Sequence, residues 1–271
     1  MTGSRARGAD TWVTAALLVY VVAFMLFLIA PLAVVVLVSF SAESYVAFPV
    51  EHYSLRWFER FFEYKPFVNS FILSVEVALL SALAGAALGV PAALAIVRSR
   101  SRIAGAAMTF LLSPLSLPHI VLGFSLLFFL ALFGQGISFV SLVAAHTVVS
   151  LPYIVRTVAG IYRGVSPNLE ETAFVLGASR WQVFRHVTFP IIRPGLFAGC
   201  LLAVLLSLDN LSVSLFFGGP STSTLPVVML SYMESQFDPS IAAASTIQLL
   251  VALVVLLIVE RTFGLKGLSA G

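Results

Sequence analysis

The chain has 271 residues, of which 60% are hydrophobic and only 10% are charged. Because a soluble domain carries about 25% charged residues, this composition excludes an ordinary soluble protein and predicts an all-α membrane protein with several spans. The net charge of +3 could suit nucleic-acid binding, but the basic residues are spread over several loops and therefore act as signals of membrane topology.

Six apolar segments are long enough to cross a bilayer, at residues 12–40, 67–97, 104–133, 137–161, 196–217 and 240–260. The first is longer than the apolar region of a signal peptide and no cleavage site follows it, so we expect an uncleaved anchor. If both termini are cytoplasmic, only Arg56, Arg60 and Lys65 of the fifteen Lys and Arg residues lie outside. The positive-inside rule therefore predicts six transmembrane helices with both termini in the cytoplasm.

The loop after the first segment carries aromatic residues at helical spacing: Trp57, Phe58, Phe61, Phe62 and Tyr64. This pattern predicts an amphipathic helix that lies at the outer membrane interface. A contact with a ligand would be the alternative.

Small residues and prolines mark the next two segments. Ser81, Gly85 and Gly89 recur every four residues in the second segment, which predicts close helix packing in lipid. Pro114 and Pro118 remove backbone donors in the third segment and predict a kink or break near mid-membrane. A broken helix at that depth could line a substrate path, but a kink satisfied by neighbouring helices would explain the same prolines.

The most polar stretch, residues 166–195, predicts two short helices hinged at Gly177. Ser166-Pro167 favours a helix start, although Asn168 could equally cap the helix. Gly177 suits the left-handed conformation of a helix end, and Ser179-x-x-Gln182 resembles a capping box. We expect the second helix to end before Pro190. A cytoplasmic loop structured in this way favours partner docking over an ordinary amphipathic surface helix.

The sequence EETAFVLGASRWQVFRHVTFP, residues 170–190, resembles the EAA loop of permease subunits in bacterial ABC importers. The family pattern is E-A-A, three residues, G, nine residues and I-x-L-P. The matching residues here are Glu171-Thr172-Ala173, Gly177 and Val187-x-Phe189-Pro190. Thr172, Val187 and Phe189 depart from the pattern, each with a residue of similar size or character. The resemblance extends from about residue 67 to residue 260.

This resemblance implies the transmembrane domain of a type I ABC importer, in which the loop binds a separate cytoplasmic ATPase dimer. The residues that carry over to ATPase coupling are Glu170, Glu171, Ala173, Gly177, Ala178 and Ser179. The chain has no GxxxxGK[ST] motif, so we expect no catalytic residues and no cofactor here, with ATP and Mg²⁺ bound by the partner ATPase. A second permease subunit, a different chain, and an extracytoplasmic solute-binding protein complete the implied partners, in a bacterial inner membrane.

In this interpretation the chain has three parts. Residues 1–66 form an N-terminal anchor helix and an outer amphipathic loop. Residues 67–260 form the permease core, with the coupling loop at 164–195. Residues 261–271 form a cytoplasmic tail.

The sequence LLSLDNLSVSLFFGGPSTSTLPVVMLSYM, residues 205–233, is similar to permeases of the spermidine/putrescine type. The matching residues are Ser207, Asp209-Asn210, Phe216-Phe217, Gly219-Pro220 and Leu225-Pro226. The similarity implies that the solute is a polyamine or a related small amine. Iron, phosphonate or an amino-acid-like compound stays open, because relatives of this type carry other solutes too.

Candidates for the substrate path are Asp209, Asn210, Glu76 and His119. An acid inside a span is costly and should face the bundle interior or a watery cavity, and the two acids would favour a cationic solute. Hydrogen bonding to neighbours, or a helix break at Asp209-Asn210, would also explain these residues. His119 and His146 also lie in spans, where the role of a neutral, hydrogen-bonded packing residue is the alternative to contact with the solute. No clustered ligands predict a metal site.

A stand-alone carrier or channel and a membrane enzyme are the two alternatives to the importer. The docking loop argues against a carrier or channel that works alone. No recognised motif around Asp209 and Glu76 supports a membrane enzyme.

Overall fold

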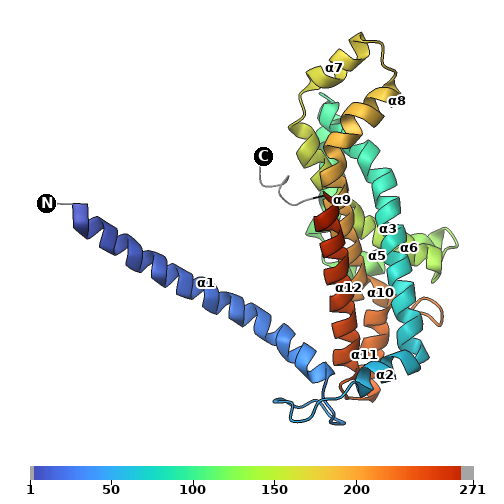
Figure 1. Cartoon of the computed structure of the whole chain (residues 1–271). Coiled ribbons are helices and arrows are strands. Elements are labelled where there is room, and N and C mark those ends of the chain that lie inside the picture. Colours follow the sequence, from blue (N-terminus) through green and yellow to red (C-terminus); the bar gives the residue numbers. More distant parts are fainter. Residues whose placement is uncertain (1–2, 264–271) are drawn as a thin grey trace. The chain divides into compact units, whose positions relative to one another are not determined.

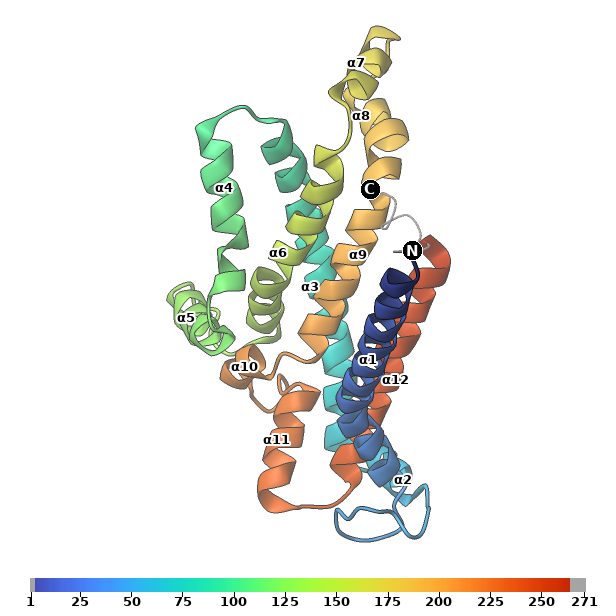
Figure 2. The same cartoon turned by 90° about the vertical axis from the view of Figure 1, so that its left-hand side faces the viewer.

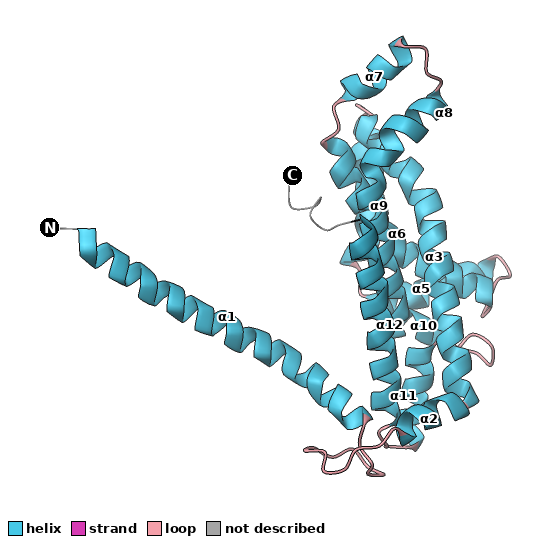
Figure 3. Ribbon diagram, viewed as in Figure 1, coloured by secondary structure: helices cyan, strands magenta, loops and turns pink. Residues whose placement is uncertain are grey.

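The computed structural model describes the backbone of residues 3–263 and the side chains of residues 12–261. The regular elements of the described chain are all helices, apart from one isolated β-bridge between Ser41 and Tyr53, which confirms the all-α prediction (Figures 1 and 3). Residues 264–271, most of the predicted tail, lie outside the described residues. The elements are α1 (Gly3–Ser39), α2 (Arg56–Glu63), α3 (Lys65–Arg98), α4 (Arg102–Leu112), η1 (Ser113–Ser116), α5 (His119–Leu132), α6 (Phe139–Arg163), α7 (Pro167–Val175), α8 (Arg180–Val183), η2 (Phe184–Thr188), α9 (Phe189–Leu208), α10 (Leu211–Ser214), η3 (Leu215–Phe217), α11 (Leu225–Ser235) and α12 (Ser240–Phe263).

The described residues divide into two compact units. The first comprises the chain up to Tyr64 together with Gln236–Leu249, and the second comprises Lys65–Ser235 together with the residues from Leu250 onward.

The first unit begins with α1, whose apolar side chains are exposed along nearly all of its described length. A helix of this kind suits a lipid environment, as predicted for the anchor. In the loop that follows, Arg56 Nη1 donates a hydrogen bond to the Ala42 carbonyl over 2.8 Å. The predicted aromatic helix is present as α2, in which Trp57 and Phe61 are buried and Phe62 is exposed.

The core of the second unit is formed by α3, α6 and α9, which pack against one another along their lengths (Figure 2). The face of α3 that carries the predicted small residues packs against α6. A Cβ added at Gly85 would lie 3.0 Å from Ile154 Cδ1. Gly199 of α9 approaches the same turn of α6 even more closely, since an added Cβ would lie 2.8 Å from Ile154 Cα. Close backbone approach of this kind is how helices associate in lipid.

Among the described residues, five helices are long and apolar enough to cross a membrane, and α4 with α5 forms a bent pair that makes a sixth span if the pair is counted as one. The chain bends by 113° between the two parts of the pair, Arg102–Ser116 and His119–Leu132 (Figure 2). The predicted break at Pro114 and Pro118 is therefore present, and the third predicted span is not straight. The turn η1 contains Pro114, and Pro118 caps α5.

Two predicted boundaries around the fifth span are wrong. The second loop helix does not end before Pro190 but continues from Arg180 to Leu208. A π-helical turn, η2, ends at Thr188, two residues before Pro190. Its wider turn suits a proline, which lacks an N–H and would clash with the carbonyl four residues earlier in a regular α-helix. The predicted span 196–217 is also interrupted, because α9 ends at Leu208 and Asn210 caps the short α10.

The close contact of Gly199 with α6 predicts that Gly199→Ala destabilises the purified protein by about 1–3 kcal/mol, because the new methyl group overpacks against the α6 backbone. Gly160→Ala is the matched control, since no atom lies within 4 Å of a Cβ added there. Both changes give a similar gain in helix propensity, so the comparison isolates packing. Melting temperatures in one detergent measure the effect, and equal values for the two variants would contradict this account of the α6–α9 contact.

Candidate functional site

The loop between α6 and α9 folds as a helical hairpin in which α7 and α8 are joined at Gly177 (Figure 1). Ser166 precedes α7 with Pro167 in the first turn, so the helix starts where the Ser-Pro signal predicts. Gly177 has a φ of +86°, the left-handed conformation expected at a helix end. The Ala178 N–H donates to the Ala173 carbonyl and the Gly177 N–H to the Phe174 carbonyl, which together form a Schellman motif.

The second helix of the hairpin begins with the predicted capping box. The Gln182 N–H donates to Ser179 Oγ over 3.3 Å, and the Ser179 N–H donates to Gln182 Oε1 over 2.7 Å. Both sides of the turn are therefore held by hydrogen bonds.

The hairpin exposes several apolar side chains. Leu176 is 82% exposed and Trp181 is 65% exposed, and Val175 and Phe174 are exposed beside them. A shallow groove between the two helices is lined by Ala173, Leu176, Gly177, Ala178, Gln182 and Val183. Contiguous apolar surface on a polar loop marks an interaction site.

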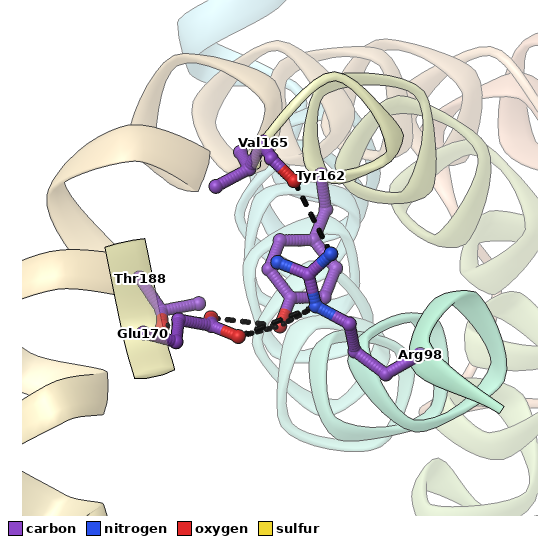
Figure 4. Close-up of polar contacts among 5 residues, drawn as sticks. All are labelled: Arg98, Tyr162, Val165, Glu170 and Thr188. Carbon is purple, nitrogen blue, oxygen red and sulfur yellow. Dashed lines mark hydrogen bonds and ion pairs between the residues drawn. The ribbon is translucent and has the colours of Figure 1, made fainter. Parts of the chain in front are cut away.

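The two adjacent glutamates of α7 lie in different environments. Glu171 is exposed, whereas the Glu170 side chain is only 15% exposed and points toward the ends of the core helices (Figure 4). Tyr162 Oη donates to Glu170 Oε1 over 2.8 Å and Thr188 Oγ1 donates to the same oxygen over 2.6 Å. Arg98 Nε donates to Glu170 Oε2 over 3.2 Å in an ion pair.

Arg98 has further contacts in this cluster. Its guanidinium lies 4.2 Å from the centre of the Tyr162 ring, and its Nη1 donates to the Val165 carbonyl over 3.2 Å. Its other terminal nitrogen, Nη2, is buried without an acceptor among the described residues. Burial raises the pKa of Glu170, but the hydrogen bonds from Thr188 and Tyr162 and the charge of Arg98 outweigh it, so the pKa is lowered and the carboxylate is ionised at neutral pH.

Within the membrane the helix break after α9 is held by buried polar groups. Asn210 Oδ1 accepts a hydrogen bond from the Val213 N–H over 3.0 Å and so caps α10. His146 of α6 forms hydrogen bonds with Ser207 at 2.7 Å, before the break, and with Ser214 at 3.0 Å, after it. This is the hydrogen-bonded packing role, one of the two alternatives for His146, and it keeps the ends of the break in place.

The four predicted path residues lie on different elements. Asp209 and Asn210 are adjacent at the break, where Asp209 is exposed and Asn210 is buried. Glu76 is exposed on α3, and His119 begins α5 directly after the bend of the third span. No group of three metal-ligating side chains occurs between residues 12 and 261, the part of the chain whose side chains are described.

Sequence reasoning grouped Glu170 with the docking residues and did not identify Arg98, Tyr162 or Thr188. The carboxylate is separated from Arg98 by 72 positions in the chain and from Thr188 by 18. One signal was available, because Arg98 ends a span and Tyr162 lies near the end of another on the same side of the membrane.

Comparison with known proteins gives several relatives of this chain. The family "Binding-protein-dependent transport system inner membrane component" matches residues 85–263. The spermidine/putrescine transport system permease protein PotC of Haemophilus influenzae is 30% identical over 84% of this chain and 88% of its own length. The putrescine permease PotI of Escherichia coli is 30% identical over 82% of this chain and 81% of its own. The molybdenum transport permease ModB of Mycobacterium tuberculosis is 36% identical over 72% of this chain and 79% of its own.

Two solved structures share the fold. A bacterial ABC transporter involved in the import of alginate gives a TM-score of 0.73, with 17% identity, over 96% of this chain and 97% of the other. An amino acid ABC transporter gives 0.59, with 20% identity, over 76% and 97%. The chain therefore belongs to the family of binding-protein-dependent transport system inner membrane components, and it is the permease subunit of an ABC importer, a transport protein rather than an enzyme.

Proposed function

We propose that this chain forms part of the translocation path of an importer for a polyamine or a related small amine and that its α7–α8 hairpin binds a cytoplasmic ATPase. The observation that carries the ATPase proposal is the hydrogen-bonded hairpin with its exposed apolar side chains, which coincides with the EAA-like sequence. A short helix held at both ends can enter a groove of a partner without losing further conformational freedom.

The rest of the proposed assembly follows from this docking. Two ATPase subunits bind ATP and Mg²⁺, and this chain itself needs no cofactor. A second, different permease completes the path, and an extracytoplasmic protein delivers the solute. The solved alginate transporter in complex with a periplasmic protein supports this last partner. The distribution of Lys and Arg supports a bacterial inner membrane with both termini in the cytoplasm.

The polyamine proposal has two supports. PotC and PotI, named for polyamine transport, match over most of the chain. Asp209 and Glu76 also place exposed carboxylates on the spans, and a carboxylate there favours a cation over an anion. The molybdenum relative gives a second candidate solute class.

Docking predicts that Leu176→Asp removes most of the ATPase that co-purifies with the permease, by at least about ten-fold, which corresponds to about 1.4 kcal/mol of binding free energy. The physical reason is that a charge would be buried unpaired in an apolar groove. Phe237→Asp is a matched control, because Phe237 is also largely exposed but lies outside the hairpin. Undiminished co-purification with Leu176→Asp would show that the hairpin does not bind the ATPase through this surface.

The solute proposal predicts that the assembled transporter in proteoliposomes takes up putrescine and not molybdate. Asp209→Asn should raise the putrescine concentration for half-maximal uptake roughly ten-fold, because a charge-assisted hydrogen bond contributes about 1.5–3 kcal/mol. Glu234→Gln is the control, since Glu234 is exposed at the end of α11. Molybdate uptake without putrescine uptake would overturn the polyamine proposal, and unchanged putrescine uptake by Asp209→Asn would remove Asp209 from the path.

A further inference from the structure

The helix α7 contains two adjacent acids that the structure separates in space, with Glu170 at the end of its first turn and Glu171 directly after it. Glu171 is exposed with the rest of the docking surface, whereas the carboxylate of Glu170 is enclosed by Arg98, Tyr162 and Thr188 (Figure 4). A carboxylate that already accepts hydrogen bonds from three side chains of its own chain has little capacity left to bind a partner protein.

The three donors come from three different helices of the core. Arg98 is the last residue of α3, Tyr162 lies next to the last residue of α6, and Thr188 closes the π-helical turn that leads into α9. These three helices pack on one another along their lengths. One carboxylate therefore connects the first turn of α7 to the ends of all the helices that form the core.

We propose that Glu170 is a positioning residue that joins the coupling helix α7 to the spans, so that displacement of α7 by the ATPase moves α3, α6 and α9 together. This inference rests on the proposed docking of the hairpin, and it assigns different tasks to the two adjacent acids. Glu171 contacts the ATPase, and Glu170 transmits the movement of α7 to the spans.

The geometry explains why a covalent connection alone is insufficient. Between α6 and α7 only residues 164–166 intervene, and between α7 and α8 only residues 176–179. Short linkers keep the helices close but do not fix the angle between them, because single-bond torsions in a linker can absorb a rotation. A partly buried ion pair reinforced by two hydroxyl donors fixes that angle, since its hydrogen bonds weaken steeply when the geometry changes.

The test uses the complete transporter with its ATPase, second permease and binding protein, and putrescine as solute. Glu170→Gln keeps the shape of the side chain and removes its charge, and Glu171→Gln makes the same chemical change one position along. We expect Glu170→Gln to retain the ATPase at the wild-type level while the putrescine transported per ATP hydrolysed falls at least five-fold. We expect Glu171→Gln to lower ATPase co-purification while the ratio in the remaining complexes is unchanged.

Two further variants keep the proposal testable if Glu170→Gln folds poorly. Tyr162→Phe and Thr188→Val each remove one hydroxyl donor to Glu170 with little change in shape, so each should lower the transport-to-hydrolysis ratio by a smaller factor, about two-fold. In addition, Arg98→Glu and Glu170→Arg should each uncouple hydrolysis from transport, and the double variant should recover part of the ratio because the ion pair is restored with exchanged charges.

Three results would overturn the proposal. One is a wild-type transport-to-hydrolysis ratio in Glu170→Gln, and another is a loss of ATPase from Glu170→Gln equal to that from Glu171→Gln, which would make Glu170 a docking residue. The third is a charge-exchanged double variant no better than either single variant. Failure of the wild-type chain to retain the ATPase is a different outcome, since it would contradict the docking proposal itself.

Discussion

The close approach of α6 to α3 and α9 is the constraint on which the rest of the second unit depends. In lipid, apolar side chains gain nothing from meeting one another instead of the acyl chains, so helices must associate through van der Waals contact of close backbones. Gly85 and Gly199 permit that contact against the same turn of α6, around Ile154. With α6 held on both sides, its two ends become fixed points: His146 supports the helix break in the membrane, and Tyr162 supports the cytoplasmic hairpin.

The interruptions of the third and fifth spans pack against each other. A Cβ added at Gly123 of α5 would lie 3.0 Å from Val213 Cα of α10 and 3.0 Å from Phe216 Cδ2. The helix that follows the proline break therefore rests on the helix that follows the Asp209-Asn210 break. Non-helical backbone at membrane depth needs its polar groups satisfied by protein, and the Asn210 cap together with the His146 hydrogen bonds meets part of that need.

Features encoded by local residue chemistry could be predicted from the sequence. The break at Pro114 and Pro118, the left-handed Gly177 and the Ser179–Gln182 capping box all follow from what one or two residues can do with their own backbone. Hydropathy alone failed at the fifth span, because apolar residues resume after Asp209-Asn210 and hide the end of the helix at Leu208. Proline alone also failed at Pro190, because the structure inserts a π-helical turn and continues the helix.

In the candidate site, too, local features could be predicted from the sequence and features that depend on helix packing could not. Its docking surface was identified from the spacing of a local pattern, but the role of Glu170 depends on which direction each of two identical neighbouring side chains takes. On a helix, consecutive residues are about 100° apart, so Glu170 and Glu171 cannot face the same surface. Which of them faces the core is decided by where α3 and α6 end, and that is a property of the packed helices. Arg98 and Tyr162 are brought together by the same close packing around α6. Gly85 and Gly199 within the membrane and the Glu170 carboxylate outside it therefore support the hairpin jointly.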